Sequence, residues 1–394
     1  MKRTFTSALL LAGCLSLSAQ YLPNEGFENW KGSCGSSLQT SSPAGERQRP
    51  GDEPSDWSGS SVNQQVSIFS ASGTLISKTT GYTGNGVNIQ NVWVGKMGVG
   101  ATAPGFITLG TPWVYAATSG ADGGVYGGMS FTNRPDAITG RFKRTDSNDE
   151  NSHIIAYLWK GTFKSGIKNG AKTTQEADNV DRAVLGRQTP TTSGTLIAKC
   201  DYTFKSTNSG WQEITVPLEY VSGQESVDPE MVNVIIAGGD YWTRGNLKEN
   251  TTLVADDVQF VYYHALNSIT YDGTTYDMAE GTTTYTIKAE EDGTIDMDKL
   301  SYSVKGVGAS VVVSSYNTKS HKFTIAVKGN DYAKNSKSIT RYTINVDQST
   351  AINNATTTSS SDNEVYSLQG IRQDASKKLQ KGIYVKDGKK VLVK

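Results

Sequence analysis

The sequence predicts an all-β protein with an N-terminal jelly-roll β-sandwich, a small immunoglobulin-like β-sandwich and a short C-terminal β-hairpin tail. Three observations lead to this prediction. Glycine is abundant (41 residues) and tyrosine is the most frequent aromatic residue (19) in a chain of 394 residues. Short alternating apolar and polar runs recur between turn-forming clusters, without sustained helical periodicity. Lysine plus arginine equals aspartate plus glutamate at 38 each, so no net field favours a nucleic-acid partner.

The chain begins with a predicted signal peptide, residues 1–19. Lys2 and Arg3 precede an apolar stretch, and small residues up to Ala19 suit signal-peptidase cleavage. Cys14 ends a Leu-Ala-Gly-Cys sequence that matches a bacterial lipobox. Because the apolar stretch continues past Cys14 without a polar tether, we favour removal of the whole signal over lipidation. Either route predicts an exported protein, at the outer membrane surface or outside the cell.

Export leaves Cys34 and Cys200 as the remaining thiols. In an oxidising compartment two cysteines can form a single disulfide, and we list Cys34 and Cys200 as that candidate pair. Cys34 lies in a Gly/Ser-rich stretch, so a free thiol stays open as the alternative.

Residues 20–263 are predicted to form the larger sandwich. We expect Leu22–Trp30 to be a first strand that pairs with the alternating run Leu253–Phe260 and so closes the sandwich. Gly32–Gly59 is predicted to be a long loop, and Lys164–Ser193 a polar insertion over one end. About eleven strands are predicted: Val66–Phe69, Thr74–Ser77, Gly86–Gln90, Phe106–Leu109, Gly128–Phe131, Ile138–Lys143, Ile154–Trp159, Thr195–Phe204, Gln212–Pro217, Val232–Ala237 and Leu253–Tyr262.

Residues 264–347 are predicted to form a second, immunoglobulin-like domain of about seven short strands, which we interpret as a spacer. Its first hairpin turns at Asp272-Gly273, a pair that suits a two-residue turn. Residues 348–364 are a Ser/Thr/Asn linker. Residues 365–394 form a basic β-tail with a second Asp-Gly turn, which is either a solvated edge or a handle for a partner.

Several motifs together resemble the Bacteroidota family named putative carbohydrate metabolism domain. They are Phe27-Glu-Asn-Trp30, Pro54-Ser-Asp-Trp57, Ser77–Gly84, Arg134-Pro-Asp136 with Gly140–Lys143, and Ala255-Asp-Asp-Val258. The resemblance covers roughly residues 20 to 262 and implies a galactose-binding-like jelly roll akin to carbohydrate-binding modules. Tyr366–Gly370 and Lys381–Tyr384 resemble the sorting domain of the type IX secretion system, which implies contact with secretion or surface-anchoring machinery.

The resemblance also implies a structural calcium ion, because many jelly-roll carbohydrate modules hold one between the first and last strands. Calcium takes six to eight oxygen ligands from carboxylates and backbone carbonyls. Glu28, Asp256 and Asp257, with a carbonyl near Gly26, have suitable chemistry. The alternative is that these carboxylates are solvent-facing strand residues. In both cases the role is structural.

Sugar binding requires flat aromatic faces with planar polar groups beside them. The loop Gly238–Gly245 offers Asp240, Tyr241, Trp242 and Arg244. Its alternative role is an aromatic plug that closes the sandwich. Trp113 with Tyr126 forms a second, weaker candidate site.

Glycoside hydrolysis requires two carboxyl groups facing each other across the bond that breaks. Glu176-Ala-Asp178-Asn-Val-Asp181 is the nearest motif, but it lies in the polar insertion. We therefore predict a non-catalytic exported protein that captures a polysaccharide or oligosaccharide. A glycoside hydrolase using Asp178 or Asp240, and a structural surface protein or adhesin without a sugar ligand, are the alternatives.

Overall fold

The computed structural model describes residues 21–66, 68–118, 120–146, 149–167, 175–208, 210–243, 247–290, 294–348, 365–374, 378–386 and 389–393. The predicted signal peptide and residues 349–364 of the predicted linker lie outside the described residues. The chain divides into two compact units. The first holds residues up to Asn267 with Ser303–Val312 and Ala326–Arg341; the second holds Ser268–Tyr302, Val313–Ile325 and the chain from Tyr342 onward. In the described parts, no helix has the length and hydrophobicity needed to cross a membrane.

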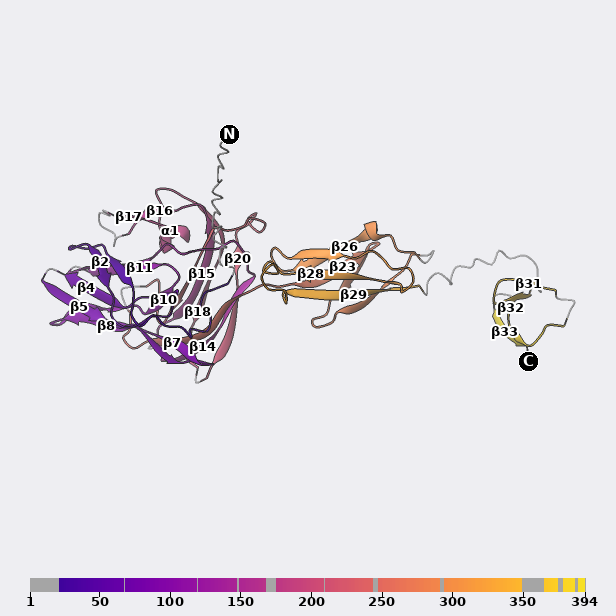
Figure 1. Cartoon of the computed structure of the whole chain (residues 1–394), viewed down its shortest axis with the longest axis horizontal. Coiled ribbons are helices and arrows are strands. Elements are labelled where there is room, and N and C mark those ends of the chain that lie inside the picture. The colour runs from indigo at the N-terminus through magenta and orange to yellow at the C-terminus, as the bar shows by residue number, and fades with distance from the viewer. Residues whose placement is uncertain are drawn as a thin grey trace, which may run out of the picture. The chain divides into compact units, whose positions relative to one another are not determined.

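The described residues are nearly all β-structure, which confirms the predicted fold class (Figure 1). One large sheet has the order β20 (Glu219–Tyr220), β18 (Thr195–Phe204), β15 (Ser152–Lys160), β21 (Met231–Ala237), β10 (Phe106–Thr108), β3 (Ser58–Gly59), with β13 (Met129–Ser130) also beside β21. A five-stranded sheet has the order β19 (Gln212–Pro217), β14 (Ala137–Asp146), β22 (Thr252–Val261), β7 (Asn85–Gln90), β6 (Ile76–Thr80).

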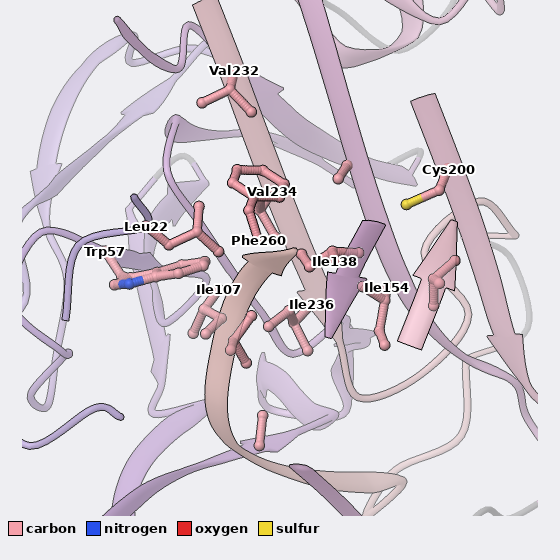
Figure 2. Packing of buried hydrophobic residues seen from close by; sticks show 14 of the residues in the cluster. Leu22, Trp57, Ile107, Ile138, Ile154, Cys200, Val232, Val234, Ile236 and Phe260 are labelled. Atoms are coloured by element: carbon pink, nitrogen blue, oxygen red, sulfur yellow. The ribbon is translucent and has the colours of Figure 1, made fainter. Parts of the chain in front are cut away.

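The main core contains buried side chains from both sheets (Figure 2). Alternation selects the residues that reach it, because successive side chains of a strand point to opposite faces. On β14, Ile138 and Phe142 are buried, whereas Thr139 and Arg141 are half-buried. Trp57 is fully buried at this core. Thr139 and Arg141 therefore lie on the face of β14 that is turned away from this core.

The larger sheet is covered on both faces. On β15, Ile154, Ala156 and Leu158 belong to the main core, whereas Ile155, Tyr157 and Trp159 belong to a second apolar cluster. Phe163, Val184 and Tyr241 supply the other side of that cluster. Burial on both faces explains why this strand is a nearly continuous apolar run instead of an alternating one.

Further elements of the first unit were not all predicted. A four-stranded sheet has the order β12 (Gly120–Tyr126), β11 (Thr111–Ala117), β1 (Ser36–Gln39), β2 (Gly45–Gln48). The two-stranded pairs are β4 (Val62–Val66) with β5 (Phe69–Gly73), β8 (Val92–Lys96) with β9 (Val99–Ala103), and β16 (Lys164–Gly166) with β17 (Glu176–Asp178), and one helical turn, α1, spans Asp181–Val184. The predicted loop Gly32–Gly59 was wrong, because it contains the hairpin β1–β2.

The predicted first strand, Leu22–Trp30, is a series of turns. Asn24 and Phe27 have positive φ angles, which are incompatible with an extended strand. The segment still contacts β22, because the Val258 amide donates to the Glu25 carbonyl at 2.8 Å. The expected neighbourhood of these two segments is therefore present, but through a turn instead of a strand pair.

Seven strands follow in two sheets. The first sheet is β24 (Thr274–Asp277), β23 (Ala265–Tyr271), β26 (Leu300–Lys305), and the second is β25 (Thr284–Lys288), β29 (Ile339–Asp347), β28 (Lys322–Lys328), β27 (Ser310–Val313), with a 3-10 turn η1 at Met297–Lys299. Asp272 and Gly273 both have positive φ, as the predicted hairpin turn requires. Near the C-terminus, β31 (Arg372–Gln373), β30 (Val365–Ser367), β32 (Gly382–Lys386) and β33 (Lys389–Val393) form a four-stranded sheet.

Candidate functional site

The outward face of the five-stranded sheet carries a polar pocket of about 400 Å³. Four segments line it: the turn before Phe27 and the strands β14, β19 and β22. Its lining residues are Glu25, Gly26, Thr139, Gly140, Arg141, Glu213, Asp257 and Gln259. We call this set the polar pocket.

A bulge in β22 positions Asp257. The pairs Thr139–Gln259 and Arg141–Asp256 show that β22 spends three residue steps where β14 spends two. Asp257 has φ of +49°, and this left-handed conformation is tolerated by aspartate better than by branched residues. The bulge sets Asp257 among the residues that line the pocket, while Val258 stays in the core.

Two carboxyl groups and an ion pair define the electrostatics of the pocket. Burial, and then the negative charge of Asp257, raises the pKa of Glu25 to about 7. One side-chain oxygen of Glu25 is buried without a hydrogen-bond partner among the described residues. Arg141 and Glu213, directly opposite on β14 and β19, form a salt bridge at 2.6 Å. The pocket therefore contains hydrogen-bond donors and acceptors in a small space.

Two aromatic rings lie beside this ion pair. The Arg141 guanidinium carbon is 4.2 Å from the ring centroid of Tyr82. Tyr82 and Trp211 meet edge to face with centroids 6.2 Å apart, and Lys143 Nζ is 5.8 Å from the centroid of Trp211. Tyr82 remains 49 % exposed. An apolar surface thus borders the polar pocket on a solvent-accessible face.

The three predicted calcium ligands gather near Gly26, and the carboxylates of Asp256 and Glu28 also accept hydrogen bonds from the protein. A β-carbon at Gly26 would lie 3.6 Å from Asp257 Oδ1 and 3.9 Å from Asp256 Oδ1. Asp256 Oδ2 accepts hydrogen bonds from the amides of Tyr82 and Thr83, at 2.7 and 3.0 Å.

Glu28 accepts from the amide and side chain of Asn85. Among the described residues, no three acidic, histidine or cysteine side chains converge on one point as metal ligands. Calcium binding stays a prediction from the sequence, and a calcium titration of the melting temperature tests it.

The loop that was predicted to bind sugar contains a core residue. Tyr241 is fully buried, packs edge to face on Phe106, and its hydroxyl donates to Asp181. Ligand contact by Tyr241 would require the outer face of the larger sheet to be open. Tyr241 instead helps to cover that face, which corresponds to the plug alternative.

Asp240 and Trp242 join a cluster of charged groups. The Trp242 indole N–H donates to Asp201 Oδ2 at 2.7 Å, and the Arg187 guanidinium carbon lies 3.9 Å from the Trp242 ring centroid. Asp201 also bonds His153 Nδ1 at 2.8 Å, and Asp240 caps its own turn by accepting the amide of Trp242. One ring face of Trp242 is therefore already covered. Arg244 lies outside the described residues.

Trp113 and Tyr126 lie together, as predicted, but inside a cluster. Trp113 is 3 % exposed and packs with Ile167, Val180 and Ala183 of the insertion. Its indole N–H has no hydrogen-bond partner among the described residues. Tyr126 is half-buried against the same cluster. These two residues thus hold the insertion onto β11 and β12.

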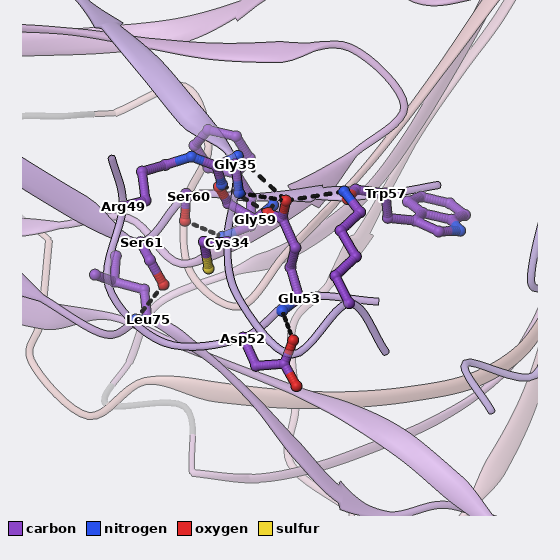
Figure 3. A network of polar contacts seen from close by, with 12 residues as sticks. Cys34, Gly35, Arg49, Asp52, Glu53, Trp57, Gly59, Ser60, Ser61 and Leu75 are labelled. Carbon is purple, nitrogen blue, oxygen red and sulfur yellow. Dashed lines mark hydrogen bonds and ion pairs between the residues drawn. The ribbon is translucent and has the colours of Figure 1, made fainter. Parts of the chain in front are cut away.

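The candidate disulfide between Cys34 and Cys200 is absent, because both residues are buried free thiols. Cys200 belongs to the main core (Figure 2), and burial raises the pKa of its thiol to about 12. Cys34 lies instead beside a buried polar network, and burial followed by the nearby Glu53 charge raises its pKa to about 11 (Figure 3). Cys200 therefore packs in the apolar core, whereas Cys34 lies beside polar groups.

That network is centred on Glu53. Its carboxylate accepts hydrogen bonds from Arg49 at 2.8 Å, from the Gly59 and Gly35 amides at 2.7 and 2.8 Å, and from Lys31 at 2.9 Å (Figure 3). Burial alone would raise the pKa of Glu53, but Arg49 and these hydrogen bonds hold it below its ordinary value. The network ties the N-terminal segment to β3.

No family model and no curated protein matches the chain. Among solved structures, it is similar to two proteins described as putative glycoside hydrolases. For the one from Bacteroides thetaiotaomicron the TM-score is 0.33 at 15 % identity, over 48 % of this chain and 57 % of the other. For the one from Bacteroides vulgatus it is 0.36 at 13 % identity, over 61 % and 97 %.

A carbohydrate-binding module of the β-sandwich superfamily aligns with a TM-score of 0.24 at 13 % identity, over 52 % of this chain and 57 % of the other. The K2 cleaved adhesin domain of Lys-gingipain aligns with 0.21 at 12 % identity, over 53 % and 91 %. These neighbours include carbohydrate-related proteins, but all four TM-scores lie below 0.5. The functional argument therefore rests on the residues of this chain.

Proposed function

We propose that this chain is an exported, cell-surface or secreted protein that binds a polysaccharide or oligosaccharide without catalysis, and that the ligand occupies the polar pocket. One observation carries the proposal: Arg141, Glu213 and Gln259 line the pocket, and the partly exposed rings of Tyr82 and Trp211 lie beside Arg141. Guanidinium, carboxylate and amide groups form paired hydrogen bonds with neighbouring hydroxyls. Aromatic rings cover the apolar faces of sugar rings.

The predicted loop at Asp240–Trp242 is a weaker location for the same function. Tyr241 is fully buried and Arg187 covers one ring face of Trp242, whereas Tyr82 keeps 49 % of its surface exposed although Arg141 stacks on it. The polar pocket also has a volume of about 400 Å³, within the range that suits small ligands. We therefore propose that the glycan binds in the polar pocket and not at the Asp240–Trp242 loop.

A glycan array identifies the ligand class, and equilibrium titration with the strongest ligand then tests the site. We expect Trp211→Ala to weaken binding by at least about fivefold, since losing one aromatic contact costs about 1 kcal/mol beyond its buried area. Trp93→Ala is the matched control, because Trp93 is 40 % exposed and lies on β8, in a two-stranded sheet separate from the strands that line the pocket. Equal weakening by both variants would place the ligand elsewhere, and no binding to any glycan would favour a structural surface protein.

A second candidate function, glycoside hydrolysis, is favoured by the pairing of Glu25 with Asp257. A carboxyl group with a pKa near 7 beside a second carboxyl group is the arrangement used for general acid catalysis. This candidate predicts slow release of reducing ends from a bound glycan. Glu25→Gln would abolish the release and leave glycan affinity nearly unchanged. Wild-type protein that binds glycan and releases no reducing ends excludes it.

A further inference from the structure

A cleft of about 910 Å³ lies between three hairpins. Two of them, β4–β5 and β8–β9, form separate two-stranded sheets, and the third is β11–β12. β4, β5 and β8 lie together at one end of the first unit (Figure 1). We call this cavity the hairpin cleft. It shares no lining residue with the polar pocket.

Small and apolar residues form most of the cleft wall. Val66, Ala71, Val94, Ala101 and Ala116 are examples, together with several glycines. Water in such a space finds few hydrogen-bond partners.

Two serines of the wall are already committed to the backbone. Ser60 Oγ donates to the Pro104 carbonyl and accepts from the Phe106 amide, both at 2.8 Å. Ser61 Oγ accepts from the Leu75 amide at 3.1 Å. The interior is therefore suited to an apolar group instead of a sugar.

The rim of the cleft exposes apolar side chains to solvent. Phe69 is 45 % exposed, Met97 81 % and Val99 66 %. Met97 occupies the first position of the two-residue turn between β8 and β9 with φ of +53°, where asparagine or glycine is usually preferred. Met97 therefore does not stabilise the turn, because the left-handed conformation is unfavourable for it and its apolar side chain is exposed to solvent.

Charge distinguishes the possible ligands. Asp122 and Lys96 are the charged residues that line the cleft. Asp122 is neutralised by two hydrogen bonds from Arg182, at 2.7 and 2.9 Å. Lys96 is exposed next to Met97 and forms no ion pair with another described residue. The cleft therefore presents an apolar interior and one cation at its edge.

We propose that the hairpin cleft binds a single-chain anionic amphiphile, with its acyl chain between the hairpins and its carboxylate or phosphate head beside Lys96. The ligand enters from solution as a monomer. Burial of each CH₂ group contributes to affinity, and the Lys96 charge selects the head group. This inference is independent of the glycan site.

Titration calorimetry with laurate, octanoate, dodecyl hexaethylene glycol ether and dodecyltrimethylammonium, each below its critical micelle concentration, tests the proposal on the full chain. We expect saturable one-to-one binding of laurate and at least tenfold weaker binding of octanoate, because each CH₂ is worth up to about fourfold in affinity. The neutral probe should bind less tightly than laurate, and the cationic probe least tightly. Binding that does not depend on chain length would overturn the proposal.

Two variants locate the ligand. Ala101→Phe places a ring in the cleft from an exposed position and should weaken laurate by more than tenfold, whereas Ser72→Phe on neighbouring β5, outside the lining, should leave it unchanged. Lys96→Glu should reverse the head-group preference and keep the chain-length dependence. Should Ala101→Phe lower the melting temperature, Val99→Asp at the rim replaces it, with the same expected loss.

Two further measurements separate other occupants. Co-sedimentation with phosphatidylglycerol vesicles that is unaffected by Ala101→Phe, together with no laurate binding, would mean that the rim adsorbs to membranes and would overturn the proposal. A concentration-dependent dimer that Val99→Asp dissociates would show that a second copy covers the rim. This result would also overturn the proposal. A monomer that binds laurate supports it.

Discussion

At the scale of single residues, the buried pair Arg49–Glu53 determines how firmly the N-terminal segment is held. Glu53 has no exposed side-chain surface and Arg49 only 2 %. Removing one partner from such a pair leaves an uncompensated charge, which costs more than the pair itself contributes. The other donors to Glu53 come from Lys31, Gly35 and Gly59, so the loss would also loosen the segment around Cys34.

We expect Arg49→Met to lower the free energy of unfolding by about 3–5 kcal/mol, and the double variant Arg49→Met/Glu53→Leu to cost less than the single one. Urea unfolding measures both. The pKa of Glu53 is lowered in the folded state, so its stabilisation is present above the unfolded value of about 4.5 and is lost as the pH falls through the lower folded value. Equal costs for the single and the double variant would refute this account.

The pKa of Glu25 shifts in the opposite direction to that of Glu53. Its pKa rises from 4.5 in the unfolded chain to about 7 in the folded protein, so between these values the folded state binds more protons. Stability should therefore fall as the pH rises from about 5 to about 7. Glu25→Gln, which resembles the protonated acid, should remove this part of the slope. Melting temperatures measured from pH 5 to 8 in the presence of a chelator test it, and identical slopes in both proteins would contradict it.

At the scale of elements, alternation predicted several strands of the two main sheets, whereas the predicted strand Val66–Phe69 is the turn between β4 and β5. Thr195–Phe204 and Gln212–Pro217 have the predicted bounds as β18 and β19. Strands in the outer parts were missed because their sequences do not alternate: β12 is Gly-Ala-Asp-Gly-Gly-Val-Tyr, and β1 and β2 are polar. Backbone pairing with neighbours, which the sequence does not display, forms these strands.

The polar pocket was not predicted for a related reason. Glu25 and Asp257 are 232 positions apart, and their contact depends on a turn and on a bulge, neither of which has a sequence signature here. The pairing of Arg141 with Glu213 depends on the register between β14 and β19. Sequence reasoning chose the Tyr241 loop because aromatic and charged residues cluster there. The sequence does not show that a second layer, which includes Tyr241, covers the outer face of the larger sheet.

The bulge itself is testable. Asp257 has φ of +49°, which asparagine adopts nearly as readily as aspartate and which a branched residue adopts at a cost. We expect Asp257→Val to lower the free energy of unfolding by about 1–2 kcal/mol relative to Asp257→Asn. Thermal unfolding of the two variants provides the comparison. If both are equally stable, backbone conformation does not constrain this position.

At the scale of the whole molecule, the larger sandwich carries the proposed binding sites and the C-terminal strands carry a proposed partner contact. Deletion of residues 365–394 removes β30 to β33. We propose that these strands are recognised by secretion or surface-anchoring machinery, so deletion should leave glycan affinity unchanged and retain the protein inside the cell envelope. Fractionation of expressing cells measures this. Unaltered export of the truncated protein would remove the tail from that role.

The central claim is that glycan binds at the polar pocket and not at the Trp242 loop. Its most direct measurement is the dissociation constant of the strongest array ligand for wild type, Arg141→Ala and Trp242→Ala. A hydrogen bond to a charged group is worth about 1.5–3 kcal/mol, so Arg141→Ala should bind about 10- to 100-fold more weakly. Trp242→Ala should bind as wild type does. Unchanged affinity in Arg141→Ala, with loss in Trp242→Ala, would contradict the account.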